Sequence, residues 1–111
     1  MAILTRRTFL AASAASALPL RGQPEDPAAW TLAQAAAAIR GRSIRPTGLV
    51  EACLRRIDVY NPKLNAFITV LRDQALAAAR EAERELAAGR SRGPLHGIPI
   101  ALKDNIDPAG V

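Results

Sequence analysis

A short stretch near the carboxyl end of the chain, Gly93–Asn105, restricts the fold more than any other part of the sequence. Within it Ile98, Ile100 and Leu102 occupy alternate positions, and small or apolar residues fill most positions between them. A period of two indicates a strand, and apolar residues on both faces are typical of a strand buried in a helix-covered sheet. The stretch therefore predicts an α/β fold with an inner strand.

A single charged residue, Lys103, follows this strand directly, ahead of the turn-forming pair Asp104-Asn105. Open α/β sheets place their binding sites beyond the carboxyl ends of the strands. Burial disfavours an ammonium ion and lowers the pKa of a lysine, which allows the neutral amine to act as a general base. The alternative interpretation is a surface lysine whose alkyl chain packs along the strand end.

The order of residues from Gly93 to Asn105, followed by Ile106-Asp107 and Ala109-Gly110, resembles the amidase signature family around its catalytic lysine. The shared motifs are Gly-Pro-Leu-His-Gly-Ile-Pro and Leu-Lys-Asp-Asn. A second stretch, residues 61–67, resembles the family more weakly. The resemblance implies an amide hydrolase with a serine nucleophile, a second serine preceded by a cis peptide, and a lysine, without metal or cofactor. It also implies that Lys103 is this lysine and accepts a proton from the second serine.

The body of the chain predicts three helices and a further strand. Thr31 and Gln34 form a capping box for the first helix, with Trp30 as a hydrophobic staple. Gly41, Asn61-Pro62 and Gly89 are expected to end the first, second and third helices in turn. In chain order the expected elements are a helix over Leu32–Arg40, a helix from the cap Thr47 to about Tyr60, a strand over Ala66–Leu71 and a helix from the cap Asp73 to about Ala88.

This order of elements, taken with the resemblance, predicts the amino-terminal portion of the amidase signature fold, a mixed sheet flanked by helices. With about three helices and two strands it is incomplete, because so few elements cannot close a sheet covered on both faces. The glycine- and serine-rich segment of this family is expected beyond Val111, since Ser43 and Ser91 lie in ordinary loops. Residues 24–111 are therefore expected to be the first segment of an amidase domain, from a truncated reading frame or a partial record.

The first 23 residues are expected to be a signal peptide. A basic start, an uncharged run between Arg7 and Arg21, and Ala-x-Ala sites are typical of secretory signals. The apolar run is too short to span a bilayer permanently. Arg6 and Arg7, with Thr5 before them and Phe9-Leu10 after, resemble the twin-arginine leader. This resemblance implies the twin-arginine export machinery as a partner, only transient membrane contact, and a periplasmic or secreted protein; the alternative is a basic amphipathic amino terminus.

The net charge, the single cysteine and the single histidine limit which partners and which chemistry the chain is expected to have. The net charge of +5 rests on 15 basic and 10 acidic residues, and removing the three leader arginines leaves 12 basic residues, so no nucleic-acid partner is expected. The one cysteine, Cys53, excludes an internal disulfide and a Cys-based zinc cluster, and is expected to be a small core residue. The single histidine, His96, is expected to be structural and hydrogen-bonded. The charged residues of 80–85 are expected to form a solvated helical flank.

Three functions are compatible with these features. The first is an amidase acting on a small amide, of which this chain carries only the lysine segment. The second is the A-subunit of a glutamyl-tRNA amidotransferase, which shares the signature but works in the cytosol, so the leader argues against it. The third is a non-catalytic remnant in which Lys103 has no partners.

Overall fold

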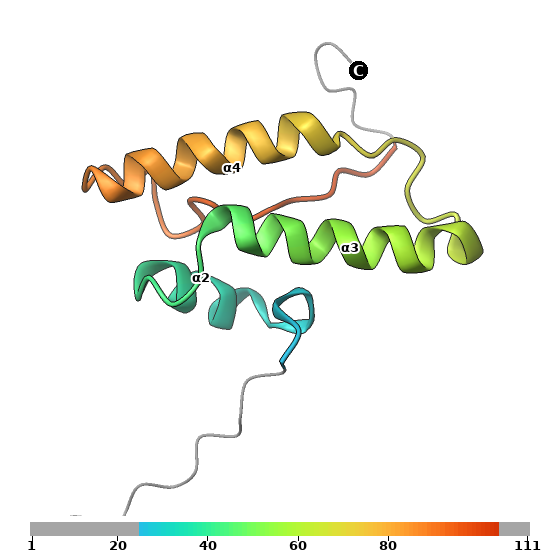
Figure 1. Ribbon diagram of the computed structural model, residues 1–111, viewed down its shortest axis with the longest axis horizontal. Helices are drawn as coiled ribbons and strands as arrows, with labels where there is room; N and C mark the ends of the chain where they lie inside the picture. The colour runs from blue at the N-terminus through green and yellow to red at the C-terminus, as the bar shows by residue number, and fades with distance from the viewer. Residues whose placement is uncertain (1–24, 105–111) are drawn as a thin grey trace, which may run out of the picture.

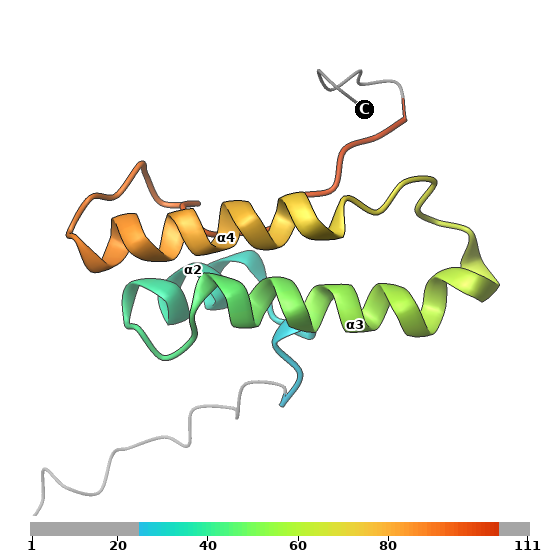
Figure 2. The same cartoon turned by 45° about the horizontal axis from the view of Figure 1, so that its top comes forward.

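The computed structural model describes residues 25–104, which form three α-helices preceded by a short 3₁₀ turn. The elements in chain order are η2 (Pro27–Ala29), α2 (Leu32–Arg40), α3 (Pro46–Leu64) and α4 (Arg72–Ala87). Helices α3 and α4 lie side by side and antiparallel (Figures 1 and 2). Helix α2 packs against the start of α3, where its Ala35 and Ile39 meet Leu49. After α4 the chain runs back along the helices in an extended form. None of the helices in this part of the chain is long and apolar enough to cross a membrane. The predicted signal peptide, with Arg6 and Arg7, lies outside the described residues.

Helix α2 has the predicted bounds and the predicted cap. The Thr31 hydroxyl accepts the Gln34 N–H at 3.2 Å, and the Gln34 side-chain oxygen accepts the Thr31 N–H at 2.8 Å. These two bonds satisfy backbone donors that a helix start would otherwise leave unpaired. The capping-box prediction is confirmed, and Ala35 and Ile39 on the inner face are buried.

Replacing Thr31 with alanine should lower the free energy of unfolding by about 1 kcal/mol, because the Gln34 N–H loses its side-chain acceptor. Urea denaturation followed by circular dichroism measures the change. Thr31→Ser keeps the hydroxyl and should stay close to wild type. An alanine variant as stable as the serine variant would contradict the capping interpretation.

Helix α3 starts earlier and ends later than predicted. Pro46 opens it, and the hydroxyl of Thr47 does not cap the helix but donates to the Glu83 carboxylate of α4 at 2.8 Å. The prediction that Asn61-Pro62 ends the helix is wrong, because the helix continues through Pro62 as far as Leu64. The helix closes instead at Asn65, which is left-handed with φ 48° and donates its N–H to the Asn61 carbonyl.

Helix α4 is capped two residues earlier than predicted and ends one residue earlier, at Ala87. Leu71, and not Asp73, precedes its first residue, and Asp73 lies in the first turn, where its negative charge favours the helix dipole. At the other end Gly89 follows with φ +75°, so the predicted glycine stop is confirmed.

The two predicted strands are not seen among residues 25–104, so this part of the α/β prediction is wrong. Residues 66–71 form the connection between α3 and α4, and residues 98–102 are extended without a partner strand. A strand needs a neighbour for its backbone groups, whereas both segments adjoin helices that bond internally. The expected burial is also missing, because Ile68 is 79% and Ile100 78% exposed.

The core is small and divided into two clusters. The first contains Ala35, Ile39 and Leu49, and partly buried residues including Trp30 and Ile98 pack against it. The second joins Val50 and Leu54 of α3 to Ala79 of α4. The first cluster therefore ties the segment that follows α4 to helices α2 and α3.

Candidate functional site

Lys103, the sequence-predicted catalytic residue, is exposed at the end of the extended segment. Its neighbours Leu102 and Asp104 are exposed as well, so the burial expected for its amine is not seen in this part of the chain. Among the described residues it makes no hydrogen bond or ion pair. The hydroxyl groups of the two loop serines form local hydrogen bonds. Ser43 donates to the Ala38 carbonyl at 3.2 Å, and Ser91 donates to the Gly93 carbonyl at 3.3 Å. The structure therefore brings neither serine to Lys103.

The loop ahead of the Lys103 segment is held by three side chains, Glu85, Arg92 and His96, which we call the Glu85 clasp. The Glu85 carboxylate accepts from the Arg92 guanidinium at 2.6 Å and lies 3.1 Å from His96 Nε2. His96 Nδ1 accepts the Arg92 N–H at 3.1 Å, and the His96 side chain is only 6% exposed. The prediction of a structural, hydrogen-bonded His96 is confirmed.

Gly97 brings the loop into close contact with the start of α3. Its φ is +86°, and a Cβ at this position would lie 2.8 Å from Cγ of Pro46. Only a glycine allows this approach without displacing the proline. The next residue, Ile98, packs against the first core cluster. The loop is thus fixed five positions before Lys103 in the sequence.

Sequence reasoning missed Glu85, which was expected in a solvated flank. Its side chain is 15% exposed because it faces the loop rather than water. Glu83 of the same stretch also turns inward, toward Thr47. A signal existed in the sequence, since Glu85 follows the buried Ala82 by three residues and so lies near the apolar face of the helix.

The pKa of Glu85 is held below its ordinary value, chiefly by the hydrogen bond from Arg92. Burial acts in the opposite direction, and the positive charges of Arg92 and Arg90 lower the pKa further. A carboxylate with a lowered folded-state pKa stabilises the fold above its unfolded pKa, and this stabilisation is lost as pH falls through the folded value. The stability difference between wild type and Glu85→Gln should therefore be largest near neutral pH and shrink in acid.

Denaturant unfolding from about pH 7 to pH 3 measures this difference across the unfolded and folded titrations of the carboxyl group. Glu81→Gln is the matched control, because Glu81 lies on the same helix but pairs with the exposed Arg84. A Glu85→Gln difference that stays constant with pH would contradict the assigned ion pair.

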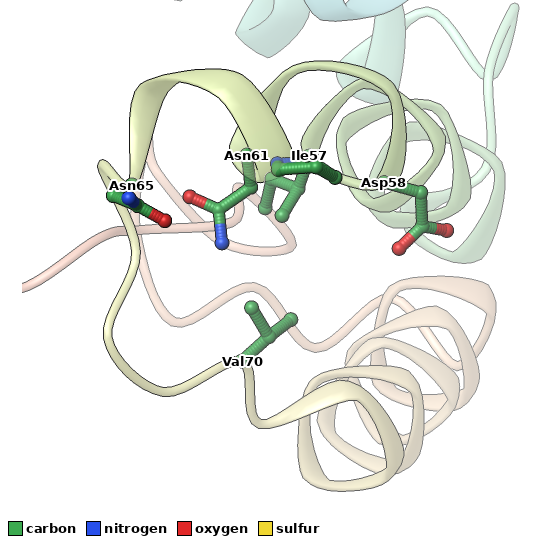
Figure 3. A pocket seen from close by; sticks show the side chains of 6 residues that line it. Ile57, Asp58, Asn61, Asn65 and Val70 are labelled. Carbon is green, nitrogen blue, oxygen red and sulfur yellow. The ribbon is translucent and has the colours of Figure 1, made fainter.

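A shallow hollow of about 270 Å³ lies where α3 meets the following loop. Ile57, Asp58 and Asn61 line it from α3 and face Val70 across it (Figure 3). Two of its polar side chains are already engaged, because Asp58 binds Arg72 at 2.5 Å and the Asn61 amide bonds both backbone groups of Phe67. No serine, lysine or histidine lines it, so it lacks the groups needed for amide hydrolysis.

Metal binding and cysteine-based catalysis find little support in the described residues. No cluster of three or more histidine, cysteine or acidic side chains is placed to hold a metal ion between residues 25 and 104. Cys53 is half-buried, and desolvation, with a smaller effect from Asp26, raises the pKa of its thiol. A raised pKa leaves little reactive thiolate at neutral pH, so Cys53 has the properties of a core residue and not of a nucleophile.

Comparison with known proteins identifies the family. Residues 48–111, more than half of the chain, match the family model described as Amidase. The chain belongs to the amidase family. The matched range includes α3 from its third residue on, all of α4, the Glu85 clasp and Lys103. The resemblance carried by the Gly93–Asn105 stretch is therefore confirmed at the level of the family.

Three curated relatives of this amidase-family chain illustrate the range of named activities. Over 81 residues, 73% of the chain, it is 48% identical to the A-subunit of a glutamyl-tRNA(Gln) amidotransferase from Chloroflexus aurantiacus. Over the same length it is 43% identical to an indoleacetamide hydrolase of Bradyrhizobium diazoefficiens and 41% identical to an amidase of Pseudomonas putida. The chain spans only 16–17% of the length of these proteins. No solved structure matches it.

Proposed function

We propose that this chain is the lysine-bearing segment of an amidase that hydrolyses the C–N bond of a small carboxylic amide. The observation that carries the proposal is the family match across residues 48–111, which includes Lys103 and its motif. Relatives named amidase and indoleacetamide hydrolase support the same class of reaction.

In the proposed mechanism Lys103 is the terminal base of a Ser-cisSer-Lys triad. Its neutral amine accepts a proton from the bridging serine, which takes one from the nucleophilic serine as that oxygen attacks the amide carbon. The tetrahedral intermediate then breaks the C–N bond as the proton returns to the nitrogen, which leaves as ammonia or an amine, and the acyl-serine remains. Water attacks this acyl-serine and releases the carboxylic acid and the free serine. The two serines and the backbone donors for the oxyanion belong to other parts of an amidase domain. Because Lys103 is exposed in the described residues, the proposal requires those parts to cover its amine.

The 111 residues by themselves are expected to hydrolyse no amide, because Ser43 and Ser91 are occupied in local turns and no catalytic serine is assigned. Incubating the purified chain with a short amide and measuring released ammonia tests this expectation. Turnover by the isolated chain would show that a different set of groups carries the reaction and would overturn the assigned triad.

A second candidate is the A-subunit of a glutamyl-tRNA amidotransferase, favoured by the 48% identity to the protein of that name in Chloroflexus aurantiacus. That function would associate the chain with tRNA-dependent chemistry, against the expectation of no nucleic-acid partner. The amino terminus discriminates the two, because we propose that residues 1–23 direct export by the twin-arginine route to the periplasm or beyond.

A reporter fused behind residues 1–30 should be exported by cells with a working twin-arginine pathway. Changing Arg6 and Arg7 together to lysine keeps the charge but removes the paired arginines, and should leave the reporter in the cytosol. Fractionation of periplasm and cytosol measures the outcome. Cytosolic retention of the unchanged fusion would contradict the export proposal and favour the amidotransferase function.

A further inference from the structure

The segment that carries Lys103 is attached to the helices only through the loop before it. After α4 the chain turns and runs back along the helices (Figures 1 and 2). The loop is bonded internally, since the His96 N–H donates to the Gly93 carbonyl at 3.2 Å and the Ile98 N–H to the Leu95 carbonyl at 3.1 Å. From Pro99 to Lys103 the chain makes no further backbone hydrogen bond among the described residues. Its direction is therefore set where the loop is held.

We propose that His96, seated in the Glu85 clasp, is a positioning residue that fixes the direction in which the Lys103 segment leaves the helices. The importance of that direction for catalysis rests on the proposed function of Lys103, whereas the docking of the loop does not.

The two ring nitrogens of His96 are both committed to the clasp. Nδ1 accepts from Arg92, so the neutral ring carries its proton on Nε2, which faces Glu85. The Nε2–Oε2 contact is 3.1 Å but lacks the alignment of a hydrogen bond, and neither atom has another hydrogen-bond partner among the described residues. Both atoms are buried, so removing either group takes away a polar neighbour that water does not replace. The enclosed ring is thus suited to hold the loop and not to contact substrate.

The clasp and Gly97 constrain the same turn from two sides. Glu85 holds His96 and Arg92 from α4, while Gly97 lies against Pro46 at the start of α3. An extended chain of five residues spans at most about 17 Å. A small rotation at the loop therefore moves the Lys103 amine by several ångströms. A displacement of about 1 Å is already enough to slow a proton transfer.

Amide hydrogen exchange in the full 111-residue chain, labelled with nitrogen-15, tests the proposal. His96→Ala should accelerate exchange at Ile98 about tenfold, the size expected for losing buried polar contacts, and should lower the heteronuclear NOE from Ile98 to Lys103. Amides in the middle of α2 and α3 should keep their wild-type rates. Glu85→Gln, which retains the side-chain shape, should produce the same local pattern, and it serves if the alanine variant does not fold. The matched control Glu81→Gln should leave Ile98 unchanged.

Two results would overturn the proposal. One is wild-type exchange at Ile98 in both the His96 and the Glu85 variants. The other is equal acceleration in all helices, which would make the clasp a contributor to global stability only. The proposed function can fail separately: if Lys103 proves dispensable for amide hydrolysis while the local exchange pattern holds, the docking stands and the catalytic assignment does not.

Discussion

Replacing Lys103 with alanine should lower kcat for amide hydrolysis by about 10²–10⁴-fold, the range that a positioned acid or base contributes. The test protein is the Pseudomonas putida amidase in which residues 48–111 of this chain, the family-matched range that contains Lys103, replace the corresponding residues of the relative. Their 41% identity favours correct folding of the chimera, and the remaining length of the relative supplies the rest of an amidase domain. Initial rates of ammonia release measure kcat.

The chain offers a matched control, because it has two lysines, Lys63 and Lys103. Lys63 is exposed in the last turn of α3. Lys63→Ala removes the same charge and should leave kcat within about twofold, a change of less than about 0.5 kcal/mol in the barrier. Activity of the Lys103→Ala chimera equal to that of the Lys63→Ala chimera would refute the assignment of Lys103.

Replacing Gly97 with alanine should lower the free energy of unfolding of the chain by about 2–4 kcal/mol. This change is the sum of two costs, the strain of an alanine in the left-handed conformation and the overpacking caused by its methyl group. The backbone strain follows from φ +86°, and the contact follows from the 2.8 Å between the new methyl group and Cγ of Pro46. The contact of Gly97 with Pro46 and the packing of Ile98 on the first core cluster should weaken together, because the two residues are adjacent. Chemical denaturation measures the change.

Gly89→Ala separates the two causes of the Gly97 effect. Gly89 also has a positive φ, +75°, but a Cβ there would meet nothing within 4 Å. Its replacement should cost only about 1 kcal/mol, the strain of a left-handed alanine. If both alanine variants lost the same stability, the close approach of the loop to Pro46 would be wrong.

Local signals in the sequence predicted the helices well. The Thr31–Gln34 capping box and the stop at Gly89 depend on groups within a few residues, so they can be recognised without knowing the fold. The stop at Asn61-Pro62 failed because the helix continues through Pro62 and ends where Asn65 adopts a left-handed conformation. Thr47 failed as a cap because its hydroxyl has a partner on another helix, Glu83.

The strands and the site depend on distant partners, which explains the remaining errors. The alternation of apolar residues from Ile98 to Leu102 favours a β-strand, but a strand forms only where a neighbouring strand pairs with its backbone groups. Lys103 was singled out by its motif, and the burial expected of it depends on groups that are not among residues 25–104, where it is exposed. The Glu85 clasp was missed because Glu85 and His96 are brought together only by the turn between them.

The central claim is that Lys103 accepts a proton as a neutral amine, and the pH dependence of kcat in the chimera tests it most directly. The account predicts that kcat falls on the acidic side by about tenfold per pH unit, because a protonated amine cannot act as a base. Lys103→Ala should lose this limb along with most of the rate. A rate independent of pH, or an acidic limb that survives unchanged in the alanine variant, would contradict the account.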